Sequence, residues 1–476
     1  MGNDLQESAI DTELAAAGTA LGAGGSKRSI VAWALWDWGT QPYYTVITTF
    51  VFSVYITSAA FVPPGGDPNG PTQALALATG VGGVVIALLA PILGQVGDRT
   101  GHTVRNLRLM TWIMVVVSAG LYFVAPNPAY LWVGLGLLVV GTIAGEIGSV
   151  SYNALIDRVA TRENVGKVSG FGWGLGYIGG ILVLVLILAL FVMPEVALFG
   201  ITDADMRVRA SMILCGLWTL AFTIPTFLSL RDSKLASAAA PLSLGIAGSY
   251  KALFATIAKV WKTQRHTGYF LLASALFRDG LAGVFAFGAV IAATSYGFAT
   301  ADIIIFGAAA NLLAGLVTMA FGLVDDKLGP KFVIQFCLVL LVLSELAIFL
   351  VHQPGYALVE GMPGYDPEVA AQGHLIFWVV GLIASAAVGP AQAAARSFLA
   401  RNIPEGHSGE IFGLYATTGR AISFLSPFLF FVAVSIGAVF AGNEASAQHW
   451  GGLALAALLF AGFLVMIPVK EQAKLK

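Results

Sequence analysis

The chain contains 476 residues, of which 57% are hydrophobic and 11% are charged, and its formal net charge is −1. This composition excludes a soluble globular protein, in which about a quarter of the residues are charged, and the balanced charge gives no indication of nucleic-acid binding. The two cysteines, Cys215 and Cys337, both lie in apolar stretches, so neither a disulfide framework nor a thiolate metal site is expected.

The first 28 residues are acidic and rich in glycine and alanine. They have neither the basic start nor the short apolar core of a secretory signal, so we expect a disordered cytoplasmic tail over residues 1–28. The remainder is long enough for about twelve membrane-spanning helices of roughly 20 residues each. The first six are expected at Ser29–Ala60, Thr72–Val96, Val104–Ala125, Pro128–Ala154, Val165–Met193 and Val208–Leu230.

A polar linker over residues 231–266 separates these helices from a second set. The second six are expected at Thr267–Tyr296, Ala301–Val324, Lys331–Val351, His374–Ser397, Glu410–Phe440 and Gln448–Pro468. The expected fold class is therefore an all-α membrane protein with twelve transmembrane helices in two pseudo-symmetric bundles. The bundles would cover residues 29–230 and 267–468, and a second cytoplasmic tail would cover residues 469–476.

Basic residues indicate which side of the membrane each loop faces. They gather in alternate loops, for example Arg105, Lys259 and Lys331, whereas the opposite loops hold only Arg207 and Arg209. Because loops rich in lysine and arginine remain in the cytoplasm, the first set is expected to be cytoplasmic, together with both termini.

A polar hairpin joins the second and third expected helices of each half. Gly94-Gln95-Val96-Gly97-Asp98-Arg99-Thr100-Gly101 is repeated as Gly322-Leu323-Val324-Asp325-Asp326-Lys327-Leu328-Gly329. Glycines permit a tight turn, and each aspartate can face the positive end of a neighbouring helix. We therefore expect Asp98 to lie against the helix that starts near Glu410 or to pair with Arg158, and Asp326 to lie against the helix that starts near Lys167. The expected gate consists of Gly94, Asp98, Arg99, Gly101, Arg158, Gly322, Asp326, Lys327, Gly329 and Arg401.

Further repeated motifs indicate that the two halves arose by duplication. Ala34-Leu35-Trp36-Asp37-Trp38-Gly39 resembles Ala275-Leu276-Phe277-Arg278-Asp279-Gly280, and Gly170 and Gly176 align with Gly413 and Gly419 at a constant offset. Parallel repeats of this kind place the substrate path between the two halves.

Ionisable residues inside the expected helices are the candidates for a substrate or coupling site, because burying a charge in a membrane costs several kcal/mol. These residues are Asp37, Glu146, Arg278, Asp279, Glu345, Arg396 and Arg420. Asp37 and Asp279 are interpreted as a recurring pair that acts on the cargo, with a structural salt bridge as the alternative. Glu146 could carry a proton, and Arg420 is interpreted as a lone cation that binds an anionic group. The aromatic residues expected to line the path are Trp36, Trp38, Tyr43, Trp173 and Tyr177.

No pattern in the chain indicates an enzyme. Gly174-Leu175-Gly176-Tyr177-Ile178-Gly179 has the letters of a dinucleotide fingerprint, but no strand precedes it, and Gly172, Gly176 and Gly180 have the spacing at which membrane helices pack closely. The sequence has no metal-ligand spacing, phosphate-binding loop or nucleophile elbow, so neither catalytic residues nor a cofactor or metal is expected.

The two hairpins resemble the signature loop of the major facilitator superfamily, a class of secondary transporters. Six further stretches resemble the vacuolar amino-acid effluxer branch of that superfamily and its bacterial relatives. They are Trp33–Trp38, Tyr152–Leu155, Ser169–Gly180, Phe277–Gly280, Ala395–Pro404 and Phe412–Tyr415. Gly176-Tyr177 stands where drug antiporters have Gly-Pro, which argues against a multidrug exporter.

The resemblance implies a secondary transporter that works by alternating access on a small polar solute, with an amino acid as the expected cargo and protons as the candidate coupling ion. A proton-coupled exporter of amphipathic compounds and a non-transporting receptor or scaffold are the alternatives. The expected location is the inner membrane of a bacterial cell, in contact with the lipid bilayer. We expect a monomer that has a small-molecule substrate and no nucleic-acid partner.

Overall fold

The computed structural model describes residues 24–232, 265–403, 407–441 and 447–470, together with isolated positions at 21, 248 and 251. Within those ranges the secondary structure is helical throughout, as expected for the fold class. The expected N-terminal tail, most of the linker over 231–266 and the last six residues lie outside the described residues.

The first half contains six membrane-crossing segments, of which the first is made of several pieces. Its helices are α2 (Lys27–Gln41) with a π-helix (Pro42–Phe50) and α3 (Phe52–Ile56), α4 (Gly70–Thr100), α5 (Thr103–Gly120), α6 (Leu131–Ala154), the short α7 (Ile156–Val159), α8 (Val165–Ile187) and α9 (Ala204–Ser229). The π-helix starts at Pro42, which has no N–H to continue the hydrogen-bond pattern of α2.

The second half repeats this arrangement with a break in a different place. Its helices are α11 (Arg265–Tyr296), α12 (Thr300–Leu328), α13 (Pro330–Val351), α14 (Pro367–Asn402), α15 (Ser408–Ala421), α16 (Leu425–Ala441) and α17 (Trp450–Met466). The expected helix Glu410–Phe440 is thus interrupted between α15 and α16. Among the described residues, ten segments are long and apolar enough to cross a membrane, and the broken first segment and the 17-residue α17 complete the twelve.

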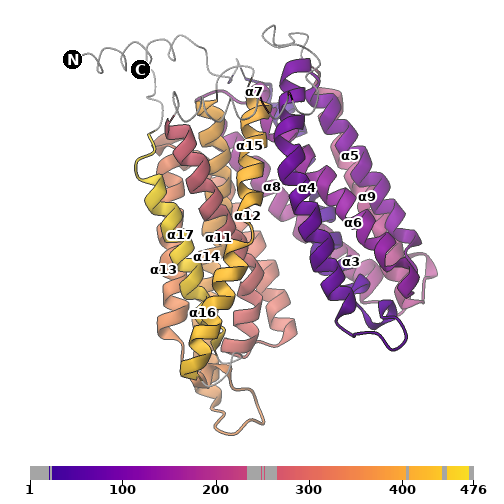
Figure 1. Ribbon diagram of the computed structural model, residues 1–476, viewed down its shortest axis with the longest axis vertical. Coiled ribbons are helices and arrows are strands. Elements are labelled where there is room, and N and C mark those ends of the chain that lie inside the picture. The colour runs from indigo at the N-terminus through magenta and orange to yellow at the C-terminus, as the bar shows by residue number, and fades with distance from the viewer. Residues whose placement is uncertain are drawn as a thin grey trace.

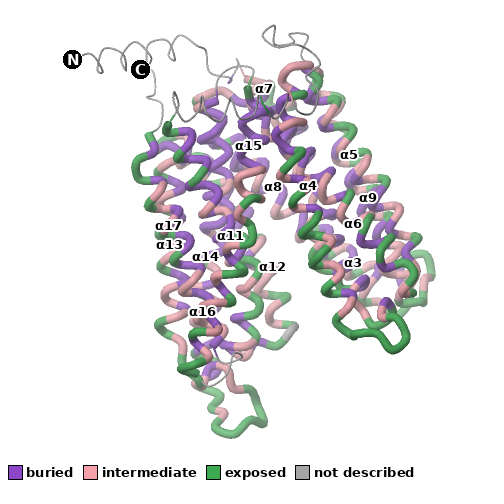
Figure 2. Tube along the Cα trace, viewed as in Figure 1, coloured by how far each residue is buried: buried purple, intermediate pink, exposed green. Residues whose placement is uncertain are grey.

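The two halves form separate bundles that approach each other at one end of the molecule and diverge towards the other (Figure 1). We call the end that holds the turns at Gly101 and Gly329 the hairpin end and the opposite end the far end. Both glycines have positive φ, 70° and 94°, a conformation that other residues rarely adopt. Buried residues concentrate where the bundles meet at the hairpin end (Figure 2).

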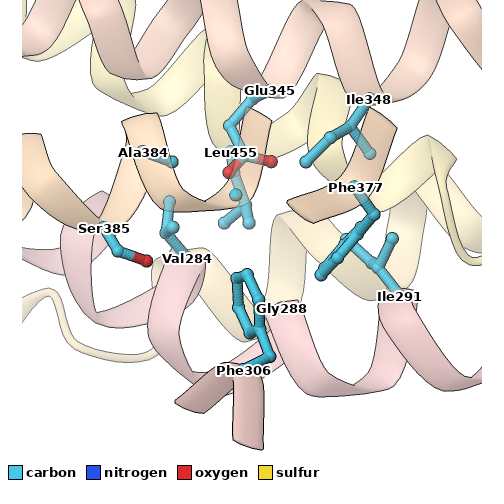
Figure 3. Close-up of a pocket in the computed structure, with 11 residues that line it drawn as sticks. Val284, Gly288, Ile291, Phe306, Glu345, Ile348, Phe377, Ala384, Ser385 and Leu455 are labelled. Atoms are coloured by element: carbon cyan, nitrogen blue, oxygen red, sulfur yellow. The ribbon is translucent and has the colours of Figure 1, made fainter. Parts of the chain in front are cut away.

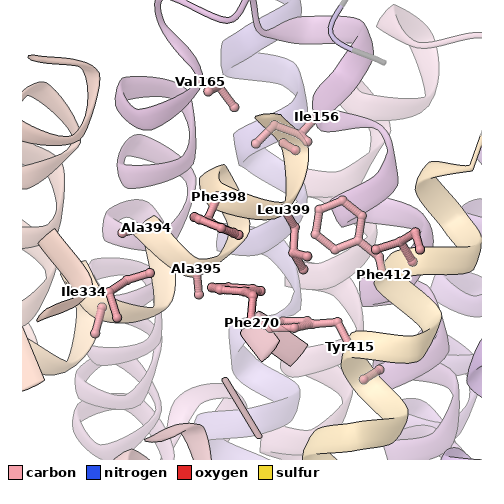
Figure 4. Packing of buried hydrophobic residues seen from close by; sticks show 14 of the residues in the cluster. Ile156, Val165, Phe270, Ile334, Ala394, Ala395, Phe398, Leu399, Phe412 and Tyr415 are labelled. Atoms are coloured by element: carbon pink, nitrogen blue, oxygen red, sulfur yellow. The ribbon is translucent and has the colours of Figure 1, made fainter. Parts of the chain in front are cut away.

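One apolar cluster crosses from half to half at the hairpin end. It combines Ile156 and Val165 of the first half with Phe270, Phe398 and Phe412 of the second (Figure 4). Phe270 and Phe398 stack with their ring centroids 4.1 Å apart. Because these side chains are fully shielded, the halves are sealed against each other at this end.

Candidate functional site

Asp98 caps a helix of the opposite half. Its two carboxylate oxygens accept hydrogen bonds from the backbone N–H groups of Gly409 and Glu410, both at 2.8 Å, at the start of α15. The N-terminal N–H groups of a helix lack partners within the helix and carry partial positive charge. The contact expected for Asp98 is therefore present. Arg158 does not pair with Asp98 but donates to the carbonyl of Arg231 at 2.8 Å.

Asp326 makes the equivalent cap in the other direction. Its oxygens accept hydrogen bonds from the N–H groups of Gly166 (2.8 Å) and Lys167 (3.0 Å) at the start of α8. Arg401 of α14 completes this cap, since it lies 3.0 Å from Asp326 and 2.6 Å from Asp325. The expected contact between Asp326 and the start of α8 is present, and Asp325 and Ser397, which sequence reasoning did not include, join the network through a short hydrogen bond.

Glycines allow the helices to cross closely at both caps. A Cβ atom on Gly413 would lie 2.6 Å from Pro91 of α4, and one on Gly170 would lie 2.6 Å from the carbonyl oxygen of Thr318 of α12. The expected gate glycines Gly94 and Gly322 lie at the same two crossings, against Gly409 and Gly166. The two remaining gate candidates lie beside these crossings: Arg99 donates to Gln95 at 3.4 Å, and Lys327 lies in the last turn of α12.

Arg396 of α14 inserts into an aromatic cage on the first half. Its guanidinium lies over the rings of Trp33, Tyr152 and Trp173, with 4.8, 5.5 and 5.7 Å to the centroids. It also donates to the hydroxyl and the carbonyl of Ser169, at 2.9 and 2.7 Å. Burial of an arginine charge costs free energy unless such contacts compensate for the lost water. Arg396 therefore connects the two halves next to the central region, by which we mean the site of Asp37, Glu146, Arg278 and Arg420.

Asp37 and Arg278 occupy equivalent places on the first helices of the two halves. The position for a Cβ on Gly176 lies 3.2 Å from Asp37, and the position for a Cβ on the equivalent Gly419 lies 3.0 Å from Arg278. The sequence analysis interpreted Asp37 and Asp279 as the recurring pair, whereas the aligned six-residue stretches and the helix contacts both make Arg278 the equivalent of Asp37.

Asp37 and Arg278 are partly exposed and bear opposite charges. Asp37 accepts a hydrogen bond from Gln41 at 3.2 Å, and Arg278 donates to the carbonyl of Tyr415 at 2.8 Å while stacking on its ring. Neither forms an ion pair with a described residue.

Asp279 has a structural environment. It is 5% exposed and accepts hydrogen bonds from the backbone N–H of Ser426 at 2.7 Å and from its hydroxyl at 3.0 Å. These bonds cap the start of α16, directly after the interruption that follows α15. Both carboxylate oxygens are thus occupied within the second half.

The sequence analysis interpreted Arg420 as a lone cation, but the structure pairs it with Glu146. Its Nη2 atom lies 2.6 Å from Oε1 of Glu146, and both side chains are partly exposed, 32% and 24%. The pair connects the end of α15 with α6 of the opposite half. Tyr44, which sequence reasoning did not include in the site, lies within electrostatic range of Asp37, Glu146 and Arg420. The alignment of the two halves did not predict this pairing. The position equivalent to Glu146 in the second half is Gly389, and the position equivalent to Arg420 in the first half is Tyr177.

The five aromatic candidates fall into two groups. Trp36 and Tyr43 are buried among the helices of the first half, where they donate to Thr111 (2.9 Å) and to the carbonyl of Leu138 (2.6 Å). The other three are partly exposed: Trp38 stacks on Trp218, Trp173 faces Arg396, and Tyr177 accepts a hydrogen bond from Gln392 of the opposite half at 3.3 Å. Trp173 and Tyr177 thus contact both halves.

The model of the family described as vacuole effluxer Atg22 like matches residues 157–474. The chain belongs to this family. An uncharacterized MFS-type transporter of Bacillus subtilis, YxiO, is 25% identical over 446 residues, which cover 93% of this chain and 94% of YxiO. Autophagy-related protein 22-1 of Neosartorya fischeri is 25% identical over 280 residues, which cover 55% of this chain and 42% of that protein.

Solved structures of major facilitator transporters share the fold. The proton:xylose symporter XylE is similar with a TM-score of 0.68 and 13% identity over 93% of this chain and 96% of XylE. A bacterial homologue of the iron transporter ferroportin, in its outward-facing state, gives 0.63 and 14% over 93% of this chain and 98% of that one. The protein is therefore an MFS-type transporter with a multi-pass membrane fold, and the expected resemblance is confirmed. That its relatives are transporters agrees with the expectation that it is not an enzyme.

Proposed function

We propose that this transporter moves a zwitterionic amino acid across the inner membrane of a bacterium by alternating access, with the hairpin end in the cytoplasm. The observation that carries the proposal is the placement of Asp37 and Arg278. They are opposite charges at equivalent positions in the two halves, and neither has an ion-pair partner among the described residues. An α-ammonium group suits Asp37 and an α-carboxylate suits Arg278, so a zwitterion would offset the cost of keeping both charges in the membrane.

The Glu146–Arg420 pair gives this site a second function. Each member belongs to a different half, and a substrate carboxylate could replace Glu146 as the partner of Arg420. Arg420 would then bind the anionic end of the cargo in one state and hold the halves together in the other. Replacement by lysine keeps the charge but loses the planar fork, so Arg420→Lys should weaken the binding of a carboxylated substrate by more than about tenfold.

The closed hairpin end corresponds to an outward-facing state in this proposal. Release into the cytoplasm requires the caps made by Asp98 and Asp326 to separate and Arg396 to leave its aromatic cage. Residues 29–230 and 267–468 would move as two bundles within a single monomer. Basic loops at the hairpin end support its cytoplasmic location.

Uptake by the purified protein in liposomes, measured with a panel of radiolabelled amino acids, tests the proposal. At least one amino acid should accumulate, and Asp37→Asn and Arg278→Gln should each abolish saturable uptake. Asp67→Asn and Arg105→Gln, at exposed positions, are the matched controls and should leave uptake unchanged. Transport of amphipathic dyes without any amino acid would instead favour the exporter alternative, and the absence of any solute flux would favour the receptor alternative.

A further inference from the structure

The second half contains a cavity of about 40 Å³ that is lined by residues of this half. It lies among α11, α12, α13, α14 and α17. Its walls are apolar, with Val284, Ile291, Phe306, Phe377 and Leu455 among them, and Ser385 and Glu345 are its polar side chains (Figure 3). A volume of this size exceeds the roughly 10–15 Å³ that one water molecule requires.

Glu345 is the unusual member of this lining. It is 3% exposed, and its Oε2 atom has no hydrogen-bond partner among the described residues. Figure 3 shows its carboxyl group directed among the lining side chains. The helix α17 passes it at Gly452, where a Cβ would lie 3.1 Å from Oε2. The packing therefore leaves room for this carboxyl group but gives it no cation.

The fold itself does not need a carboxylate here. Counted from the aligned hairpin glycines, the equivalent position in the first half is Val117, which is buried in an apolar core. An isolated buried carboxylate costs several kcal/mol more than an apolar residue unless it is neutralised. The observation thus points to a ligand that neutralises Glu345.

The other carboxylates inside the helices already have partners. Asp279 caps α16, Glu146 pairs with Arg420, and Asp37 accepts a hydrogen bond from Gln41. Glu345 has none among the described residues, and one wall of its cavity is formed by α11 and α14, which also carry Arg278 and Arg396. Val284 of this wall is followed directly by Phe285, which stacks towards Tyr177 of the opposite half.

We propose that Glu345 is a proton-binding site of the second half, and that its protonation and deprotonation are coupled to transport. The assignment of the site rests on the geometry of the cavity, whereas the coupling rests on the proposed transport function. Protonation converts the carboxylate to a neutral acid and needs no further ligand. Deprotonation would draw water or a cation into the cavity and so disturb the packing of α11 and α14, which carry Arg278 and Arg396 of the central region.

Few titratable groups face Glu345. Tyr296 of α11 lies within electrostatic range, and its hydroxyl donates to the carbonyl of Ile348 at 2.9 Å. The facing side chains of α12 and α14 that line the cavity are not titratable. His352 follows the end of α13, and His449 precedes the start of α17. Burial and the neighbouring His449 lower the pKa of His352 to about 4, so His352 brings no positive charge near neutral pH.

Infrared spectroscopy of the purified protein, without a substrate, tests the protonation of Glu345. At neutral pH the spectrum should contain the carbonyl band of a buried protonated carboxyl group, and Glu345→Gln should remove this band. Glu360→Gln, at an exposed position of the same half, is the matched control and should retain it. A spectrum that is identical in wild type and Glu345→Gln would overturn the inference. A band that sodium chloride abolishes would show a sodium site and overturn the proton assignment.

Transport measurements then test the coupling. In liposomes, Glu345→Gln and Glu345→Val should lose amino-acid accumulation driven by a pH gradient but retain exchange of amino acid across the membrane. Gradient-driven accumulation at the wild-type level in both variants would overturn the coupling. If the wild type transports no amino acid, the proposed function fails, whereas the infrared result still decides whether Glu345 binds a proton.

Discussion

The two hairpins make the same cap with different charge compensation. At the first, Asp98 binds two N–H groups of α15, and no described cation lies within 4.0 Å of it. At the second, Asp326 binds two N–H groups of α8, and Arg401 bridges it to Asp325. The duplicated turn thus preserves the helix cap, whereas among the described residues an arginine pairs with the hairpin aspartate in the second copy only. The second crossing should therefore depend on charge balance and the first on capping and close packing.

Removal of Arg401 should have the largest effect on this asymmetry. Arg401→Ala removes the cation that bridges Asp325 and Asp326, which are 3% and 15% exposed. Breaking a buried pair in this way costs about 3–5 kcal/mol, so the hairpin end should open. Spin labels at Arg105 and Leu328, both exposed, should report a longer distance between the halves.

Arg158→Ala is the matched control for that experiment. Arg158 occupies the position equivalent to Arg401, but its side chain is 30% exposed and contacts a carbonyl group and Asp157. The spin-label distance should stay near that of the parent protein. Equal opening in both variants would contradict the asymmetry of the hairpins.

A second substitution should partly reverse the effect of the first. In the double variant Arg401→Ala/Asp325→Ala, one of the two carboxylates that lose Arg401 is absent, so about 1–3 kcal/mol of the loss should be recovered. The thermal unfolding midpoint in detergent should lie between those of the parent and of Arg401→Ala. A midpoint below that of the single variant would show that Asp325 stabilises this crossing independently of Arg401.

Removal of either cap should have a smaller effect. Asp98→Ala and Asp326→Ala each delete two hydrogen bonds to a helix N-terminus, for which a loss of about 1–2 kcal/mol is expected. Asp326→Ala also removes one ion pair of Arg401, which keeps Asp325 as its partner. Both variants should widen the distribution of spin-label distances at the hairpin end without shifting it fully to the open state. An effect of Asp98→Ala as large as that of Arg401→Ala would mean that the first crossing also depends on a charge partner.

The smallest effect is expected at Gly97, the position in the first hairpin where the second has Asp325. A Cβ there would lie 3.5 Å from Asn106 and 3.7 Å from Thr103, which are ordinary contacts. Gly97→Ala should therefore raise stability by at most about 1 kcal/mol through the better helix propensity of alanine. Gly166→Ala is the contrast, because its Cβ would lie 2.6 Å from Asp325 and should lower the unfolding midpoint.

The fold and the hairpin contacts could be predicted because their signals are local. Apolar segment length defines the helices, and glycine spacing with one aspartate defines the caps of Asp98 and Asp326. The central site was harder to predict. The pairing of Arg420 with Glu146 depends on helix rotation and on contacts between halves, which one sequence does not encode locally. Glu345 was recognised as ionisable, but its lack of a partner is visible only once five helices surround it.

The interruption between α15 and α16 has a mechanical consequence. A continuous helix transmits bending along its whole length, whereas this span has a joint near its middle. On the hairpin side of the joint, the two bonds from Asp98 tie α15 to α4 of the first half. On the far side, the two bonds from Asp279 tie α16 to α11 of the second half. The eleventh span is therefore held by both halves, and Arg420, in the last turn of α15, lies directly beside the joint.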